Sequence, residues 1–460
     1  MSTTLSTVPH VLCAEEPLLP VVGGDLQVPL LDGSTVRFAN LDYAATAPAL
    51  ASVAERVARV LPYSGSVHRG AGLPSQVSSA LYEAARRSIG AALGARADDL
   101  VVFTRNTTDA TNLLASVVPI GSGDVLTLDL EHHANLLPWH RAGDGHRCVA
   151  HADTVDGTFE RLEAELRRRP VALLALTGAS NVTGELLPIR RAVALAHAHG
   201  ARVFVDAAQL APHRAIDLAA IGADYLAFSG HKLYAPYGSG VLVGRRDWLD
   251  AAEPYLAGGG AVREVTTTAV EWTTGPARHE AGTPNLVGAV AIAAAFEALG
   301  ALQPEARETH EEALRQRVLD GLAAIDGVDA LRIWEGDGEA IGVVAFAVDG
   351  YAPGHVGAYL SAEHGIGVRD GRFCAHPLLA RFGRTAGALR ASFGVGSRAE
   401  DADRLVEALR RLVEEGPRHA YCDGPAGWVP EQDPRDLAAW TGLELGLDTA
   451  PATRSPCGNG

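Results

Sequence analysis

Long apolar runs are absent from this 460-residue chain. No stretch approaches the roughly 18 apolar residues that a membrane-spanning helix needs. The opening segment, Met1–Thr7, also lacks the basic residues and the apolar core of a secretory signal. We therefore predict a cytoplasmic protein that has no membrane partner.

Basic residues are scarce as well. The chain has 39 Lys and Arg against 55 Asp and Glu, which gives a net charge of −16 and a pI near 5.5. Nucleic acids and anionic membranes both need a basic face, so neither is expected as a partner. The 47% hydrophobic content supports a large core, and the length suits two or three domains or one large α/β domain with a satellite.

Cysteines are few and widely scattered. The five are odd in number and never form a C-x-x-C pair: Cys13, Cys148, Cys374, Cys422 and Cys457. This pattern indicates neither a disulfide framework nor a zinc site, and we predict no metal centre.

Strand and helix patterns alternate in the first part of the chain. Apolar, β-branched runs predict strands at 100–104, 125–130, 171–176, 202–205 and 223–228. Alanine-rich amphipathic runs predict helices at 107–118, 134–141, 159–168 and 188–199. Alternation at these lengths predicts right-handed crossovers and a mostly parallel, doubly wound α/β sheet.

The C-terminal third changes to a smaller α+β pattern, with strands at 342–348, 366–369 and 389–393 and helices at 353–361 and 398–413. We predict four regions along the chain. These are an N-terminal arm (1–40), a large cofactor-binding domain (41–303), a small C-terminal domain (304–416) and an irregular tail (417–460).

Polar residues follow the predicted strands, at the carboxyl edge where ligands collect in such sheets. Five consecutive strand ends lead to Arg105–Asp109, Glu131–Asn135, Gly178–Gly184, Asp206–Gln209 and Lys232. The first of these segments opens a helix, where free N–H groups and the hydroxyls of Thr107 and Thr108 can hold a phosphate. We expect all five to converge on one crevice.

Lys232 ends the segment Ser229-Gly-His-Lys232 after a buried strand. A lysine in this position is usually a solvated surface charge, whereas a desolvated one can form an imine with a carbonyl cofactor. Asp206 could be an ordinary helix N-cap, but a buried carboxylate also needs a cationic partner. Together the two residues favour a pyridoxal phosphate site, with Lys232 as the imine and Asp206 holding the ring nitrogen protonated.

Other residues at this edge have both structural and functional interpretations. His133 could pack at a strand end or stack on a cofactor ring, and Gln209 could be a buried amide or a partner of the cofactor's phenolate oxygen. Ser229 and His231 suit a phosphate by position, as Thr108 does, although each could form only a turn. His68 and Arg69 are candidate site residues in the glycine-rich loop 64–72.

Cys374 lies in a glycine-rich, charged loop, Gly365–Pro377, whose arginine and histidine residues favour a thiolate. The usual alternative, an inert small hydrophobe, suits Cys148 better. Arg390 interrupts an apolar strand, where it would bind a structural carboxylate or a substrate α-carboxylate. Arg369, in the same loop as Cys374, is a second candidate for the substrate.

Ten ordered motifs between Leu41 and Leu412 closely resemble those of the cysteine desulfurases of the class V aminotransferase group, in the branch that includes selenocysteine lyases. They are LDYAATAP, VHRG, TTDATNL, EHHAN, SNVTG, DAAQ, SGHKLY, EAGTPN, VRDGRFCAHP and RASF. The resemblance implies a pyridoxal phosphate-dependent enzyme of fold type I that forms a homodimer with shared active sites.

The resemblance also implies a role for each matched residue. Lys232 would form the Schiff base, Asp206 would pair with the pyridinium, His133 would stack on the ring and Gln209 would reach O3′. The phosphate would be bound by Thr108, Ser229 and His231, and by Thr283 from the other subunit, while Asn181 and Arg390 would orient the substrate carboxylate.

Cys374 would take sulfur from cysteine, giving a persulfide and alanine, and a protein would accept the sulfur. Phe373 departs from this pattern, because sulfur-mobilising members usually carry a histidine directly before the cysteine. The N-terminal arm and the tail are also longer than usual. The alternatives are a C–S lyase, a decarboxylating or transaminating enzyme acting on a larger cysteine S-conjugate, and a non-catalytic fold member.

Overall fold

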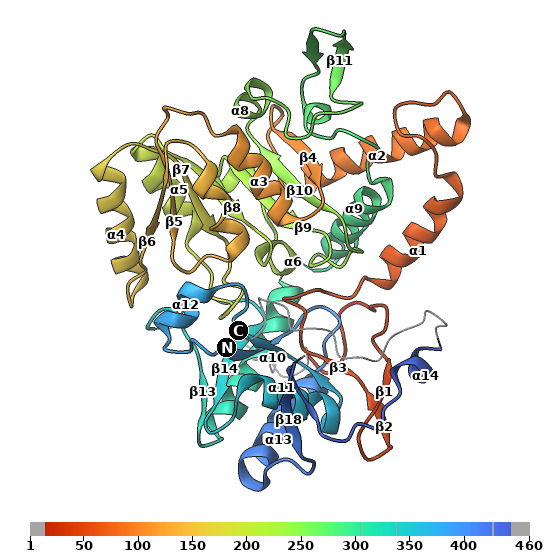
Figure 1. Ribbon diagram of the computed structural model, residues 1–460, viewed down its shortest axis with the longest axis vertical. Helices are drawn as coiled ribbons and strands as arrows, with labels where there is room; N and C mark the ends of the chain where they lie inside the picture. The colour runs from red at the N-terminus through yellow and green to blue at the C-terminus, as the bar shows by residue number, and fades with distance from the viewer. Residues whose placement is uncertain (1–13, 304, 337, 426, 443–460) are drawn as a thin grey trace, which may run out of the picture.

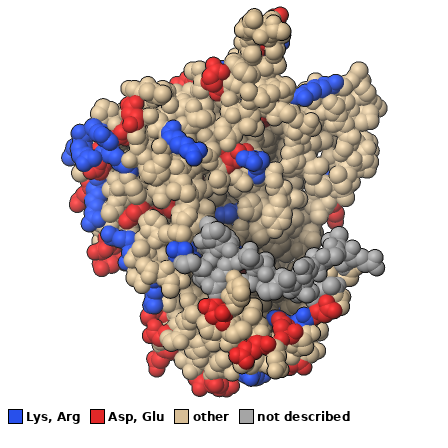
Figure 2. Space-filling view, in the orientation of Figure 1, with Lys and Arg blue, Asp and Glu red and all other residues tan. Residues whose placement is uncertain are grey.

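The computed structural model describes residues 14–303, 305–336, 338–425 and 427–442. Figure 1 shows two lobes: an upper lobe built on the large sheet and a lower lobe that combines the C-terminal elements with the red N-terminal strands. In the view of Figure 2, acidic side chains are numerous over the lower lobe, in keeping with the net charge of −16.

A seven-stranded sheet forms the upper lobe, in the order β4-β10-β9-β8-β7-β5-β6. β10 is antiparallel to both of its neighbours and the other pairs are parallel. The strands are β4 (Leu100–Thr104), β5 (Asp124–Leu128), β6 (His146–Val149), β7 (Val171–Thr177), β8 (Arg202–Asp206), β9 (Tyr225–Ser229) and β10 (Gly240–Gly244). The predicted mostly parallel sheet is confirmed, and β6 and β10 are added to it.

Helices cover both faces of this sheet, because alternate residues of each strand point to opposite sides. Val203 and Val205 of β8 belong to the same buried cluster as residues of α5 (Ile189–Ala198) and α9 (Leu286–Gly300), whereas Phe204 packs in the cluster of α3 (Thr107–Val117). The sheet is therefore doubly covered, and its carboxyl edge stays available for a site.

The other helices of this lobe are α1 (Ala51–Val60), α2 (Leu73–Ala92), α4 (Val155–Arg168), α6 (Leu210–His213), α7 (Leu218–Ile221) and α8 (Arg246–Ala251). The predicted helix at 134–141 is wrong. This stretch forms two short 3-10 turns, η2 (His133–Asn135) and η3 (Pro138–Arg141), because Pro138 cannot donate the N–H that a continuous helix would need.

The lower lobe is an antiparallel sheet in the order β13-β14-β17-β16. Its strands are β13 (Val328–Ala330), β14 (Val343–Val348), β16 (Arg369–Gly371) and β17 (Ala388–Ser392), and its main helices are α10 (Ala306–Ala323), α11 (Pro353–His364) and α13 (Ala399–Glu415). These elements share a core of their own that includes Phe346, Leu360 and Leu409. The arm joins this lobe, since β3 (Ala39–Asn40) pairs in parallel with β15 (Ile366–Gly367).

Residues 417–460 were predicted to be irregular, but β18 (Tyr421–Gly424) and β19 (Gly427–Pro430) form an antiparallel hairpin. The indole of Trp428 stacks on His355 of α11, with ring centroids 4.5 Å apart and planes at 3°. Glu363 accepts a hydrogen bond from the Tyr421 hydroxyl at 3.0 Å. The irregular tail was predicted from the proline content of this segment. The prediction did not take Tyr421 and Trp428 into account. Residues 1–13 of the arm and 443–460 of the tail lie outside the described residues.

Within the described ranges, no helix is long and apolar enough to cross a membrane. Among the same residues, His, Cys, Asp and Glu form no group of three or more that could hold a metal ion.

Replacing Trp428 with Ala should detach the hairpin without unfolding either lobe, because the stacked indole joins it to α11. We expect limited proteolysis to cut within 417–430 at least several-fold faster than in the wild type. Val429→Ala, on the exposed side of the same strand, is the matched control and should leave the cleavage rate unchanged. Equal cleavage of the Trp428 variant and the wild type would contradict the anchoring role.

Candidate active site

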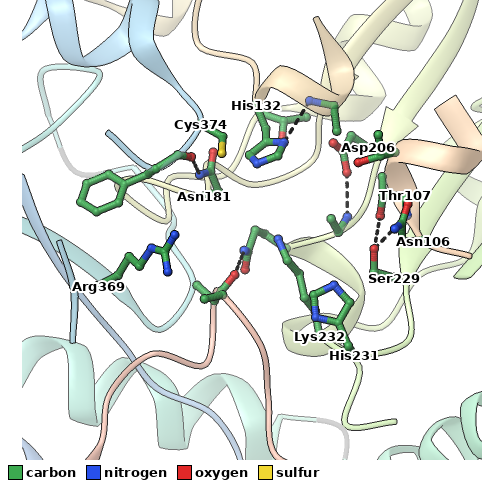
Figure 3. A pocket seen from close by; sticks show the side chains of 18 of the residues that line it. Asn106, Thr107, His132, Asn181, Asp206, Ser229, His231, Lys232, Arg369 and Cys374 are labelled. Carbon is green, nitrogen blue, oxygen red and sulfur yellow. Dashed lines mark hydrogen bonds between the residues drawn. The ribbon is translucent and has the colours of Figure 1, made fainter. Parts of the chain in front are cut away.

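A cavity of roughly 340 Å³ lies at the carboxyl edge of the large sheet, where the two lobes meet. Figure 3 shows Lys232 in it, with Asp206 to one side, Arg369 to the other and Cys374 and His132 above. The predicted site residues that line it are Thr107, Thr108, Asn181, Asp206, Gln209, Ser229, His231, Lys232, Arg369, Cys374 and Arg390. The five strand ends therefore converge as expected.

Asp206 is the last residue of β8, and Lys232 follows the neighbouring parallel strand β9. Burial lowers the pKa of Lys232 to about 8, although the carboxylate of Asp206 opposes this shift. Asp206 is 4% exposed, and burial raises the pKa of its carboxyl group against the opposing effects of the Ala208 N–H and of Lys232. A substantial fraction of the Lys232 amine is consequently neutral near physiological pH, as a nucleophile or base requires.

Lys232 is also the only lysine in the 460 residues. Its singularity is a simpler signal of function than the neighbouring residues on which the prediction rested. The other basic side chains are arginines, which cannot supply a neutral amine, and histidines, whose imidazoles carry no primary amine. Amine chemistry by a side chain is therefore confined to one position.

The N-terminus of α3 meets the end of β9 beside Lys232. The backbone N–H and the hydroxyl of Thr107 lie 2.8 and 2.7 Å from the Ser229 hydroxyl, and Asn106 caps the helix by accepting from the Asp109 N–H at 2.9 Å. A Cβ at Gly240 would lie 2.7 Å from the Asn106 Cα, so glycine allows this close approach. Hydroxyls grouped at a helix N-terminus are suited to a phosphate.

His231 lines the same side of the cavity. Its Nδ1 lies 3.1 Å from the hydroxyl of Thr46, and burial lowers its pKa to about 4. The imidazole is therefore neutral at physiological pH and can donate one hydrogen bond to an anion.

Of the adjacent residues His132 and His133, His132 lines the cavity, whereas the sequence pattern was interpreted as giving the stacking role to His133. Nδ1 of His132 accepts from the Ala134 N–H at 3.0 Å, and burial lowers its pKa to about 3. The ring of His133 instead meets that of His376 edge-on. Two adjacent histidines at a strand end point in different directions, and the sequence offered no means to choose between them.

Gln209 leaves one polar atom unused at the cavity. Its side-chain N–H donates to the Ala44 carbonyl at 2.6 Å, which fixes the amide, while Oε1 is buried without a hydrogen-bond partner among the described residues. A buried acceptor without a partner costs free energy, and a ligand that donates to it would recover that cost.

Arg390 comes from β17 of the lower lobe and is 3% exposed. It donates to the Asn181 carbonyl at 2.8 Å and to the carboxylate of Asp42 at 3.0 Å, while its Nε is buried and has no partner in the described part of the chain. The structure thus supplies the structural carboxylate that was one of the two predicted partners, and it also leaves one guanidinium N–H without a partner among the described residues. Asp42 was not identified beforehand, although it lies in the LDYAATAP motif.

Cys374 is held in an unusual backbone conformation. Phe373 and Cys374 have φ angles of 53° and 52°, a region that non-glycine residues seldom adopt. The side-chain N–H of Asn181 donates to the Phe373 carbonyl at 2.9 Å, and the backbone N–H of His133 donates to the Cys374 carbonyl at 2.8 Å. These two bonds present the half-buried Cys374 to the cavity.

His68, Arg69 and Thr283 do not join this cavity. His68 and Arg69 line a second hollow beside Glu280, where Arg69 donates to the carbonyls of Gly259 and Gly282. Thr283 is exposed on the loop that follows Gly282. The sequence placed them in site motifs but could not say which cavity they face.

A buried lysine amine, a buried carboxylate and a hydroxyl-lined helix N-terminus, at the carboxyl edge of an α/β sheet, define an enzyme whose chemistry depends on that amine. The aminotransferase class-V family model matches residues 39–405. The chain therefore belongs to the class-V aminotransferase family, in its cysteine desulfurase branch.

The relatives cover most of the chain. A probable cysteine desulfurase 2 of Mycobacterium leprae is 38% identical over 82% of this chain and 92% of its own length, and a cysteine desulfurase of Klebsiella pneumoniae is 37% identical over 75% and 86%. Among solved structures, the cysteine desulfurase CsdA of Escherichia coli, in an S-sulfonic acid form, superposes with a TM-score of 0.74 at 35% identity. That match covers 82% of this chain and 95% of the other.

The pKa of Lys232 can be measured directly in the cofactor-free protein, because the only other amine is the N-terminal one. We expect acylation of Lys232, followed by peptide mass spectrometry, to rise through a midpoint near pH 8. Asp206→Asn should move the midpoint to lower pH, because it removes the carboxylate that raises the pKa. A midpoint above pH 10 would mean that the amine is solvated.

Proposed function

We propose that this enzyme is a pyridoxal phosphate-dependent cysteine desulfurase, which cleaves the C–S bond of L-cysteine to leave alanine and a persulfide on Cys374. The observation that carries the proposal is that Cys374 lines the same cavity as Lys232, Asp206 and Arg390. One substrate-sized space is thus surrounded by four groups: a lysine amine, a carboxylate that can pair with a ring nitrogen, a guanidinium that can bind a substrate carboxylate, and a thiol.

The residues present fit the cofactor. Asp206 would hold the ring nitrogen, Gln209 Oε1 would receive the hydrogen bond that it lacks, and His132 would take the ring-stacking role first given to His133. Thr107, Thr108, Ser229 and His231 would bind the phosphate. When bound, pyridoxal phosphate supplies an aldehyde for amines and a ring that stores the electrons released at the substrate Cα.

The chain's own residues account for substrate binding and proton transfer. Arg390 Nε and Arg369 would orient the α-carboxylate, with Asn181 beside them. The neutral Lys232 amine would remove the Cα proton, and its lowered pKa lets it accept and return that proton near neutral pH. Burial of the site keeps water from competing for these groups.

Cys374 would then act on the substrate sulfur. Its thiolate forms an S–S bond with that sulfur as the substrate Cβ–S bond breaks, and the carbon fragment gains a proton and leaves as alanine. Two hydrogen bonds to the strained Phe373–Cys374 backbone hold the thiol at the cavity. This positioning favours attack because it keeps the Cys374 sulfur close to the substrate sulfur.

A second candidate is a C–S lyase, or a decarboxylating or transaminating relative, that acts on a larger cysteine S-conjugate. Phe373 favours it, because an apolar ring, 4% exposed and 5.3 Å from the Arg390 guanidinium, directly precedes Cys374. Such an enzyme would use the same cofactor residues and would not need the Cys374 thiol.

The proposal includes a homodimer in the cytoplasm that passes sulfur to a protein acceptor. His68 and Arg69 line a hollow apart from their own chain's cavity, and Gly282 and Pro284, the neighbours of Thr283, line it too. This arrangement suits residues that complete the cavity of a partner subunit.

Replacing Cys374 with Ala should reduce alanine formation from cysteine to the background level, because no other thiol of the described residues lines the cavity. Product analysis with free cysteine and with S-substituted cysteines, for the wild type and the variant, is the measurement. Cys148→Ala is the control and should keep the wild-type rate. Retained turnover with pyruvate or an aldehyde as product would favour the second candidate.

Replacing His132 with Ala should weaken cofactor binding about fivefold, since aromatic stacking contributes about 1 kcal/mol. It should also change the visible absorption of the holoenzyme. His133→Ala is the matched neighbour and should keep both the dissociation constant and the spectrum. The reverse result, with only the His133 variant altered, would restore the original assignment.

A further inference from the structure

Two imidazoles stand beside Cys374 without lining the Lys232 cavity. The rings of His133 and His376 meet edge-on, with centroids 4.4 Å apart and planes at 78°. His376 begins α12 (His376–Arg381), two residues after Cys374, and the His133 backbone N–H donates to the Cys374 carbonyl. Both side chains are half-buried, and neither has a part in the chemistry proposed above.

This pair has unused capacity to bind protons. His376 Nε2 is buried and makes no hydrogen bond to any described residue. Burial lowers the pKa of both imidazoles, and the charge of Arg372 lowers them further. Arg372 is the charged group that acts on both rings, and its own Nε is likewise buried without a partner in the described ranges. Two neutral imidazoles and a cation with a spare donor thus adjoin the loop of Cys374.

The desulfurase reaction needs such groups after alanine has left. A persulfide on Cys374 blocks the next turnover until another thiol removes its outer sulfur. An ordinary thiol has a pKa of about 8.5 and is mostly protonated at neutral pH, whereas only the thiolate is a good nucleophile. Transfer at neutral pH is therefore faster where a base takes the proton of the incoming thiol.

We propose that the His133–His376 pair is the proton acceptor for the thiol that takes sulfur from Cys374. This inference rests on the proposed desulfurase function. The incoming R–SH gives its proton to the imidazole pair and attacks the outer sulfur of Cys374–S–SH. The new S–S bond forms as the bond to Cys374 Sγ breaks, and the proton passes to the Cys374 thiolate. The products are R–S–SH and Cys374–SH, so the step needs no oxidant or reductant.

Arg372 would act in the same step by stabilising the thiolate of the incoming group. Leu137, which is 55% exposed, donates its backbone N–H to the His133 carbonyl, so exposed apolar surface adjoins the pair.

The test separates sulfur transfer from persulfide formation. Holoenzyme is given one equivalent of cysteine, the Cys374 persulfide is verified by intact-protein mass spectrometry, and a thiol is then added to follow its loss. His376→Asn should slow transfer to 2-mercaptoethanol, a high-pKa alkyl thiol, by roughly 10²-fold at pH 7. Transfer to 4-mercaptobenzoate, a low-pKa aromatic thiol that is already ionised, should stay within about twofold of the wild type.

His133→Asn is the second variant and should give the same thiol-dependent pattern. His140→Asn is the matched control, because His140 and His146 form a similar edge-on pair, with centroids 4.7 Å apart, that does not line the cavity. The pH profile gives an independent readout: wild-type transfer to the alkyl thiol should decline only as the imidazoles protonate, whereas the His376 variant should follow thiol ionisation.

Equal slowing with both thiols would assign the pair a structural role and overturn the inference, as would wild-type transfer in both variants. Failure of the wild type to form a persulfide on Cys374 would instead overturn the proposed desulfurase function. The two failures are therefore distinguishable within one experiment.

Discussion

The removal of the Lys232 amine from water, beside the carboxylate of Asp206, is the interaction on which the rest of the site depends. Burial favours the neutral amine and the protonated acid, while each group's charge favours the charged form of the other. The balance leaves an amine with a pKa of about 8, far below that of a surface lysine. This balance holds because two parallel strands end side by side and helices on both faces exclude solvent from the sheet.

The second constraint is the joining of the two lobes above this pair. Arg390 reaches from the lower sheet to Asn181 and Asp42, and Asn181 in turn holds the Phe373 carbonyl. A strained loop and a buried cation are thus fixed by the same short network. The loop that carries Cys374 gains its position from contacts with the upper lobe, so Cys374 lies where the lobes meet.

Much of this could be anticipated from local patterns. Buried parallel strands are nearly continuous apolar runs, and five of them were found by that property. Two strands of the large sheet were not predicted because their sequences are not continuous apolar runs. β6 is an edge strand that contains His146 and Arg147, and β10 begins and ends with glycine after the Lys232 loop. The hairpin at 421–430 was missed because its proline and glycine content outweighed Tyr421 and Trp428, whose partners lie on α11.

The site divides in the same way. The sequence by itself determined the amine, since it contains one lysine, and it determined which polar groups follow each strand, because the carboxyl ends of parallel strands share one edge. Only the tertiary structure decided between His132 and His133, because adjacent residues after a strand differ in direction by backbone angles that composition does not encode. The tertiary structure alone shows that His68 and Arg69 lie apart from the cavity and that the ring of His376 contacts the ring of His133, because those contacts join segments far apart in the chain.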